Sequence, residues 1–224
     1  MPRRARPRSR PAAASEASPA PAAPPRIIGG TLRGRRLDYA PERAAAAEGP
    51  RTGPARTRPM KDRVRETLFD LLGPAVSGRI ALDLFAGTGA LGFEALSRGA
   101  VRAIFVERHF PTADALGRVA ATLGVADAVE VRPGDALAWG RRLPVDLPRS
   151  APWIVFISPP WSFFTERAAD LVALVAALRA AAPAGSGFAV EADAAFDPAL
   201  LPDPTVWRRH EIPPAVLHLD SGLV

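Results

Sequence analysis

A short stretch of polar, proline and aromatic residues follows the apolar segment Trp153–Ile157. Ser158, Pro159, Pro160 and Trp161 stand there in order. Each proline fixes its backbone φ and lacks an N–H, so its carbonyl is free to face a ligand, and the tryptophan offers a stacking face. The combination predicts a rigid pocket for a flat ring that carries an amine. Ser158 and the Pro159 carbonyl would accept hydrogen bonds from that amine.

A glycine-rich loop follows an earlier apolar segment. It runs from Asp83 through Phe85 to Gly87 and Gly89, and its glycine spacing fits the pattern G-x-G-x-x-G. Loops of this pattern stand between a strand and a helix and hold nucleoside cofactors, including the nicotinamide dinucleotides of dehydrogenases. The loop therefore predicts a nucleoside site but does not by itself choose the cofactor.

Two acidic residues, Asp83 and Asp135, favour S-adenosylmethionine over NAD as that cofactor, and a third, Glu107, would serve either one. Asp83 enters the loop, where it would attract a positive sulfonium or amino group and repel a pyrophosphate. Glu107 is placed to accept hydrogen bonds from ribose hydroxyls, and Asp135 to accept one from an adenine amino group. With the proline-rich pocket, these residues predict methyl transfer to the exocyclic amine of a base. The predicted cofactor residues are Asp83, Phe85, Gly87, Gly89, Glu107, Arg108, Asp135 and Ala136.

Strands and helices must alternate along the chain to position these groups. We expect strands over Ile80–Phe85, Ala103–Val106, Ala128–Val131, Trp153–Ile157, Gly187–Glu191, Thr205–His210 and Ala215–Leu219. We expect helices over Asp62–Leu72, Ala90–Arg98, Thr112–Leu123 and Phe164–Ala182. This order predicts an α/β fold with an open, mostly parallel seven-stranded sheet, helices on both faces and an antiparallel C-terminal edge. Ligands bind beyond the carboxyl ends of the strands in such sheets, and the candidate residues fall at those ends.

The front of the chain is strongly basic. Residues 1–25 carry five Arg and one Glu, and residues 26–65 carry eleven basic and four acidic residues, whereas the remainder is net acidic. Such asymmetry predicts a polyanionic partner, and nucleic acid is the usual one. Composition divides the chain into a disordered Arg/Pro/Ala tail over 1–25, a basic N-terminal element and helix over 26–72, and a cofactor-binding domain over 73–224.

Two local expectations concern the basic region that follows the tail. Thr31–Leu37 is expected to form a small β element with glycine turns. In the following helix, the apolar spacing predicts that Val64, Leu68 and Leu71 share the buried face, with Arg63 and Arg65 elsewhere.

Several classes of protein are disfavoured by composition. Cysteine is absent, and His109, His210 and His218 lack the spacing of metal ligands, so we expect no metal site. No apolar run reaches the roughly 18 residues that span a membrane, and no secretory signal is visible, so we expect a cytoplasmic protein. Hydride transfer is disfavoured because no Tyr-Lys pair is placed for it and Tyr39 is the only tyrosine. We expect a monomer.

Three blocks of sequence resemble one known family. The blocks Arg26–Gly30 with Leu32–Arg35, Arg58–Phe69 and Leu82–Gly99 are similar to the bacterial 16S ribosomal RNA guanine-N2 methyltransferases, and the similarity extends to about Glu191. The resemblance implies a Rossmann-like class I methyltransferase that uses S-adenosylmethionine. It also implies that the stretch from Ser158 to Trp161 takes the place of the family's Asp-Pro-Pro-aromatic motif. RNA contacts are implied for Arg26, Arg33, Arg35, Arg58, Lys61 and Arg63.

The chain departs from that family at the motif itself. Ser158 stands where Asp is usual, and Trp161 where Tyr or Phe is usual. A neutral acceptor forms a weaker hydrogen bond than a carboxylate, which would slow transfer on the order of tenfold. The main hypothesis is methylation of guanine N2 in small-subunit ribosomal RNA, with a small-subunit particle as substrate. Two alternatives stay open: a catalytically weakened RNA-binding assembly factor, and an amino methyltransferase that acts on another base.

Overall fold

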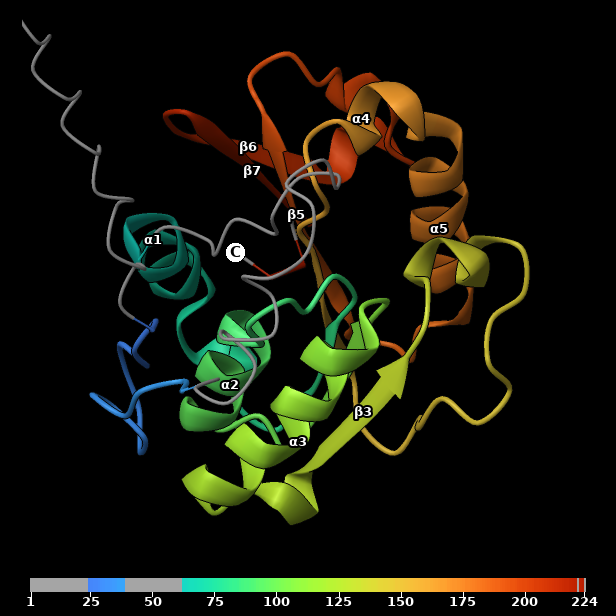
Figure 1. The fold of residues 1–224 in the computed structure, drawn as a ribbon. Helices are drawn as coiled ribbons and strands as arrows, with labels where there is room; N and C mark the ends of the chain where they lie inside the picture. Colours follow the sequence, from blue (N-terminus) through green and yellow to red (C-terminus); the bar gives the residue numbers. More distant parts are fainter. Residues whose placement is uncertain (1–23, 39–61, 221, 224) are drawn as a thin grey trace, which may run out of the picture.

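The computed structural model describes residues 24–38, 62–220 and 222–223 (Figure 1). Nearly all of the expected tail lies outside the described residues, as do Arg58 and Lys61, two of the residues predicted to contact RNA. Among the described residues, no helix combines the length and the apolar character needed to cross a membrane.

Seven strands form one sheet within the described part of the chain, in the order β3-β2-β1-β4-β5-β7-β6. The strands are β1 (Ile80–Asp83), β2 (Arg102–Glu107), β3 (Val129–Pro133), β4 (Trp153–Ile157), β5 (Gly187–Asp193), β6 (Trp207–Ile212) and β7 (Ala215–Asp220). Strands β1 to β5 pair in parallel, and β7 runs antiparallel to both β5 and β6. The predicted seven-stranded α/β fold with an antiparallel C-terminal edge is confirmed.

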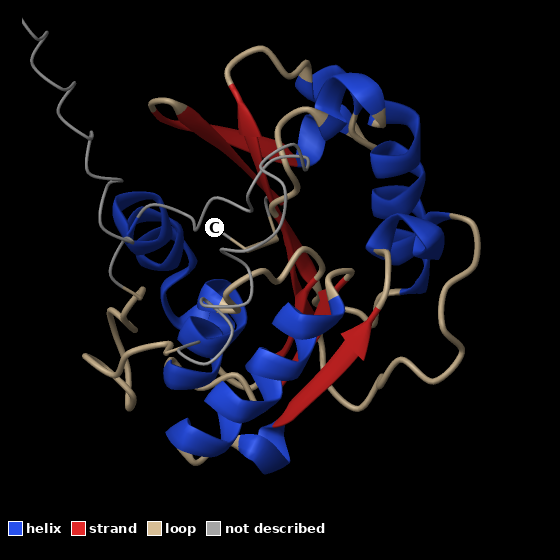
Figure 2. Cartoon of the chain, in the orientation of Figure 1, coloured by secondary structure: helices blue, strands red, loops and turns tan. Residues whose placement is uncertain are grey.

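Helices cover both faces of the sheet (Figures 1 and 2). One face carries α1 (Asp62–Leu72), α2 (Ala90–Ser97) and α3 (Phe110–Leu123), and the other carries α4 (Phe163–Glu166) and α5 (Ala168–Ala181). Short 3-10 helices lie at Gly73–Val76 (η2), Ala126–Ala128 (η3), Ala136–Gly140 (η4), Pro198–Leu200 (η5) and Pro204–Val206 (η6). The central strands β1 and β4 are buried along their whole length, which explains their unbroken apolar sequences.

The basic segment Thr31–Leu37 does not form the expected β element. Residues 31–34 make a turn, and a single bridge joins Arg26 to Arg36. Gly30 and Gly34 have φ angles of 73° and 83°, and this left-handed backbone interrupts any extended strand. Residues 26–37, the N-terminal element, instead pack on α2 and bury Ile27 and Leu37 in the core.

Arg65 was expected away from the buried face of α1, and this was wrong. The side chain is fully buried, with Nη2 2.9 Å from Asp62 Oδ1 and Nε 3.7 Å from Glu94 Oε2. Glu94 is itself fully buried on α2, so the guanidinium enters the core as its counter-charge. Leu71 is half-buried, and Phe69 belongs to the buried face instead.

The long helix expected over Phe164–Ala182 is divided into α4 and α5. The backbone leaves the helical conformation at Arg167, where φ is −133° and ψ is 25°. The Arg167 Nε atom donates to Asp170 Oδ2 at 2.6 Å in the first turn of α5, and the Phe164 ring packs 4.6 Å from the Phe196 ring. The helix is therefore interrupted at Arg167 although neither Gly nor Pro marks the break.

Candidate active site

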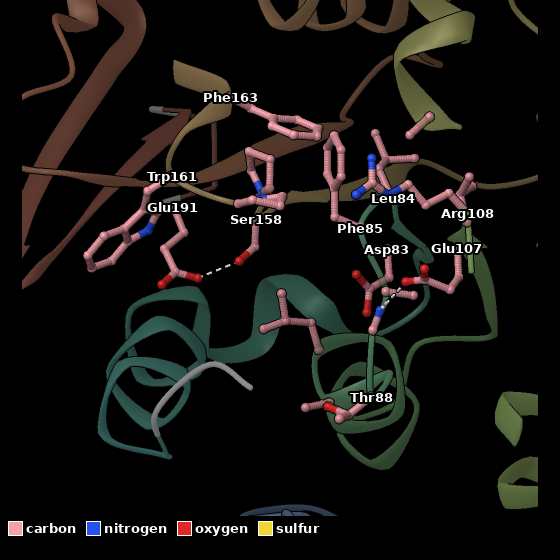
Figure 3. Close-up of a pocket in the computed structure, with 18 of the residues that line it drawn as sticks. Asp83, Leu84, Phe85, Thr88, Glu107, Arg108, Ser158, Trp161, Phe163 and Glu191 are labelled. Atoms are coloured by element: carbon pink, nitrogen blue, oxygen red, sulfur yellow. Dashed lines mark hydrogen bonds between the residues drawn. The ribbon is translucent and has the colours of Figure 1, made fainter. Parts of the chain in front are cut away.

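A cavity of about 490 Å³ opens beyond the carboxyl ends of the parallel strands β1, β2, β4 and β5 (Figure 3). It brings together the predicted residues of the glycine loop, of the two following strand ends and of the proline-rich stretch. The predicted residues that line it are Asp83, Phe85, Gly87, Glu107, Arg108, Asp135, Ala136, Ser158, Pro159, Pro160 and Trp161.

Gly89 belongs to the glycine loop but does not line the cavity. It precedes the first residue of α2 and has a left-handed φ of 67°. A Cβ atom added there would lie 2.6 Å from Leu116 Cδ2 and 2.8 Å from Phe93 Cε2. The glycine therefore allows α2 to begin close against α3, which shapes the loop.

Asp83 contributes a buried carboxyl group at the end of β1. Its exposed fraction is 2%, and its Oδ2 accepts a hydrogen bond from the Gly92 N–H at 3.1 Å. Burial raises the pKa of Asp83 to about 7, and the nearby carboxylate of Glu107 adds to the rise. A positively charged ligand in the cavity would favour the ionised form of this carboxyl group.

Glu107 and Asp135 hold the backbone of the cavity wall. Glu107 Oε2 accepts from the Gly87 N–H and Oε1 from the His109 N–H, each at 2.8 Å. Asp135 Oδ1 accepts from the Leu137 N–H at 2.9 Å and so caps η4. A carboxylate has about four acceptor positions, so each group retains capacity to bind hydroxyl or amino groups of a ligand.

Phe163 is a cavity residue that the sequence reasoning missed. Its ring centre lies 5.6 Å from the guanidinium carbon of Arg108 and 6.3 Å from the ring of Phe85, which it meets edge-on. In Figure 3 the Phe163 and Phe85 rings lie beside each other above the loop that bears Asp83. The signal was an aromatic residue two positions after Trp161, which the pattern of the proline-rich stretch did not include.

Glu191 is the second residue that was missed, and it lies beside Ser158. The Ser158 hydroxyl donates to Glu191 Oε2, with 2.5 Å between the two oxygens. Glu191 is 8% exposed, and burial raises the pKa of its carboxyl group while the hydrogen bond from Ser158 partly opposes the rise. The available signal was an acidic residue inside the apolar strand Phe188-Ala189-Val190-Glu191-Ala192.

The cavity has two chemically distinct ends (Figure 3). Asp83, Glu107 and Arg108 stand at one end, and Ser158, Trp161 and Glu191 at the other. The charged side chains that line it are four acidic ones (Asp83, Glu107, Asp135 and Glu191) and one basic one (Arg108). This balance suits a cationic ligand and disfavours a pyrophosphate. Within the described ranges, no group of three or more His, Cys, Asp or Glu side chains could hold a metal ion.

The predicted RNA-contacting residues lie outside the cavity. Arg26, Arg33 and Arg35 are exposed on the N-terminal element, and Arg63 is exposed on α1. Arg26 Nη1 donates to the Gly34 carbonyl at 3.2 Å, and Arg35 Nη2 donates to the Thr122 carbonyl at 2.8 Å. The side chain next to Arg63, that of Val64, lines the cavity, so α1 links the basic surface to the candidate site.

Comparison with known proteins identifies relatives along most of the described chain. The family model described as Conserved hypothetical protein 95 matches residues 25–193. The ribosomal RNA small subunit methyltransferase D of Escherichia coli K12 is 38% identical over 136 residues, which cover 61% of this chain and 60% of that protein. The protein of the same name from Haemophilus influenzae is 36% identical over 151 residues, which cover 66% and 69%.

The matched segments therefore span between 54% and 69% of the length of the first relatives found. Among solved structures, the Escherichia coli protein yhhF has a TM-score of 0.64 and 29% sequence identity. That match covers 88% of this chain and 96% of the yhhF chain.

Proposed function

The chain belongs to the Conserved hypothetical protein 95 family, and from this membership and its cavity we propose that it methylates ribosomal RNA with S-adenosylmethionine as methyl donor. The observation that carries the proposal is that one cavity joins an acidic glycine loop to the stretch Ser158–Trp161. Relatives named ribosomal RNA small subunit methyltransferase D support the reaction class and the kind of substrate.

The end of the cavity that contains Asp83 and Glu107 is suited to hold the cofactor. Asp83 would attract its positive charge, Glu107 would accept from its ribose hydroxyls, and Asp135 from its adenine amino group. Arg108, Phe85 and Ala136 complete this wall, and Gly87 allows close approach. When bound, S-adenosylmethionine supplies an activated methyl group: the amine lone pair forms the N–C bond, the C–S electron pair stays on sulfur, and the methylated nitrogen releases a proton.

The other end of the cavity is suited to hold the acceptor base. The Ser158 hydroxyl oxygen and the Pro159 carbonyl would accept the two N–H groups of an exocyclic amine, which localises its lone pair on nitrogen. Trp161 would stack on the ring, and Pro160 stiffens the turn. Alignment of the amine with the methyl group would supply most of the acceleration. No strong base is needed before transfer, because the methylated nitrogen can release its proton afterwards.

We assign the N2 amine of a guanine in small-subunit ribosomal RNA as the target. The names of the relatives support a small-subunit substrate, and the exposed Arg26, Arg33, Arg35 and Arg63 would contact RNA phosphates. RNA contacts are also proposed for Arg58 and Lys61, which lie outside the described residues, on the resemblance of their sequence block alone. A small domain has limited area for selecting one nucleotide, so a ribosomal particle is the expected substrate rather than free RNA.

The test is methyl transfer to small ribosomal subunits that lack their modifications. We would incubate them with the protein and radiolabelled S-adenosylmethionine and identify labelled nucleosides. N2-methylguanosine at one position is the expected product. Label on another base would support the proposed methyltransferase activity but overturn the assignment of guanine as the target. Absence of transfer, with cofactor binding intact by calorimetry, would overturn the enzyme and favour an RNA-binding assembly factor.

A further inference from the structure

Ser158 and Glu191 are held at the same level of the sheet by the pairing of their strands. β4 and β5 are parallel neighbours with Ile157 opposite Val190, so the next residue on each strand stands beside the other. Both side chains line the cavity, and the hydroxyl and carboxylate oxygens are 2.5 Å apart. The dashed line in Figure 3 marks this contact, with Trp161 next to it.

The Glu191 carboxyl group is otherwise poorly compensated. It also borders a small hollow lined by apolar side chains, among them Leu68, Leu91 and Leu217. Across the described residues, no Arg or His side chain forms an ion pair with Glu191. A buried carboxyl group without a cationic partner destabilises the fold, so packing alone does not account for its presence.

We propose that Glu191 is a positioning residue that acts through Ser158 on the target amine, an inference that rests on the proposed methyl transfer. A serine hydroxyl has one proton, and here that proton is committed to Glu191. The remaining lone pairs of the hydroxyl oxygen can therefore only accept, which is what an amine N–H requires. The charge of Glu191 also polarises the hydroxyl and strengthens its acceptor oxygen.

The same geometry explains how the chain functions without an aspartate at position 158. A carboxylate at that position would stand beside Glu191 on the neighbouring strand, and two adjacent carboxylates disfavour each other's ionised form. In this chain two residues take the place of that single carboxylate. The Ser158 hydroxyl would contact the amine, and the Glu191 carboxylate, hydrogen-bonded to the hydroxyl, would supply the negative charge. Position 191 thus determines which residue type is suitable at position 158.

The test is a double-mutant cycle on the two positions in the full chain, with kcat measured on small subunits. Glu191→Gln should lower kcat about tenfold, because a neutral partner polarises the hydroxyl less and its amide can donate to the Ser158 oxygen. Ser158→Asp alone should be no faster than the wild type. The double variant Ser158→Asp with Glu191→Gln should recover at least the wild-type kcat. Glu191→Gln would then lower kcat in the wild type but raise it in the Ser158→Asp variant.

Two further measurements separate this role from a merely structural one. The dissociation constant of S-adenosylmethionine should stay within about twofold in Glu191→Gln, since tighter or weaker cofactor binding is not part of the mechanism. The unfolding midpoint should fall in Ser158→Asp and recover when Glu191→Gln is added, independently of activity. The matched control, Glu211→Gln, changes an exposed carboxylate on β6 and should leave kcat unchanged.

The outcomes distinguish the two proposals. The positioning role is overturned, and the proposed function stands, if the wild type transfers methyl groups but Glu191→Gln slows the wild type and the Ser158→Asp variant equally, or slows neither. If the wild type transfers no methyl group, both are overturned. Should Glu191→Gln fail to fold, the comparison is made in the Ser158→Ala background, which lacks the hydroxyl through which Glu191 acts. Ser158→Ala with Glu191→Asp should then have the same kcat as Ser158→Ala alone. A lower kcat in the double variant would overturn the role.

Discussion

The Asp83 carboxyl group combines a backbone contact with a place in the cavity wall. Its Oδ2 accepts from the Gly92 N–H, and the residue lines the cavity that would receive the cofactor. Its ionisation and cofactor binding must therefore be coupled, because a cationic ligand interacts favourably with the ionised form alone. Since burial raises the pKa of Asp83 to about 7, this coupling should affect cofactor binding near neutral pH.

We predict that the affinity for S-adenosylmethionine falls as the pH is lowered through about 7, the pKa of Asp83. Binding to the ionised form releases a proton below that pH, so the dissociation constant should rise by up to about tenfold per pH unit. Calorimetry from acid to mildly alkaline pH, in two buffers of different ionisation enthalpy, measures both affinity and proton release. Asp83→Asn should bind weakly at every pH, and a flat profile for the wild type would contradict the coupling.

Three acidic residues of the site were predicted from their places at strand ends, whereas Glu191, also the last residue of an expected strand, was missed. Asp83, Glu107 and Asp135 each follow an apolar segment, so their placement at the cavity follows from the alternation of strands and helices. Glu191 enters the site only because β5 lies next to β4, which is a property of strand order rather than of local sequence. The roles of all these residues remain predictions.

At the scale of elements, one buried carboxylate joins three parts of the chain. Glu94 on α2 accepts from the Ile28 and Gly29 N–H groups at 2.8 Å each, and from Arg98 Nε at 2.9 Å. Arg65 of α1 lies on the same carboxylate, and its Nη2 also donates to the Arg26 carbonyl. The N-terminal element, with its exposed arginines, therefore depends on Glu94 for its position.

We predict that Glu94→Ala lowers the free energy of unfolding by about 3–5 kcal/mol, because it removes the buried one of the two carboxylates beside Arg65 and the acceptor of the Ile28 and Gly29 N–H groups. Urea denaturation measures the loss, and limited trypsin digestion should cut within residues 26–37 sooner than in the wild type. Glu211→Ala removes an exposed ion-pair partner of Arg209 and should change stability by less than about 1 kcal/mol. Equal effects of the two substitutions would refute the proposed role of Glu94.

His218 gives the antiparallel edge of the sheet a response to acid. It is 1% exposed on β7, its ring lies 5.6 Å from the ring of Phe196, and burial lowers its pKa to about 4, with a further contribution from the charge of Arg209. Between pH 6.5 and about 4 the unfolded chain binds a proton at this residue and the folded chain does not. Stability from His218 is thus complete above pH 6.5 and is lost as the pH falls toward 4.

We predict that His218→Leu reduces the loss of stability between about pH 7 and pH 4 by on the order of 2–3 kcal/mol, because each unit by which burial lowers the pKa of His218 contributes about 1.4 kcal/mol. The comparison with the wild type by chemical denaturation isolates this histidine, because Asp83 and Glu191 respond in both proteins. His109→Gln, at an exposed histidine, is the control and should leave the pH dependence unchanged. An unaltered slope in His218→Leu would exclude His218 as its source.

The limits of prediction at this scale arise from contacts between elements. The helices α4 and α5 are divided at Arg167, which has a non-helical backbone conformation although no Gly or Pro is present there to indicate it. The burial of Arg65 depends on Glu94, which lies much later in the chain and on another helix. In both cases tertiary contacts override the local preferences from which helices are predicted.

At the scale of the whole molecule, the described surface joins a basic region to an acidic cavity. Arg63 is exposed on α1, one residue before Val64 of the cavity wall. A polyanion held by such arginines would present one of its bases at the cavity, while the acidic lining repels its phosphates.

We predict that Arg63→Gln weakens binding to small subunits and reduces the slope of log affinity against log salt by about one, because one phosphate contact is removed. Affinity measured between roughly 50 and 200 mM salt tests this expectation. Arg208→Gln changes an exposed arginine on β6 and should leave the slope unaltered. The same slope in both variants would argue against a contact at Arg63.

The overall architecture was predictable because strands and helices alternate and because the strands read as apolar runs. The parallel part of the sheet, its helical layers and its antiparallel edge follow from that alternation. The position of β7 between β5 and β6 does not, since it requires the chain to turn back and enter the sheet interior.

That position of β7 sets an order of events during synthesis. β5 remains an open edge until residues 215–220 have been made, because β6, which is translated earlier, pairs only with β7. Pro214 and Ala215 also form part of the cavity wall. A nascent chain therefore has no finished cavity wall until the ribosome has translated β7, and the proposed methyl transfer must wait for that step.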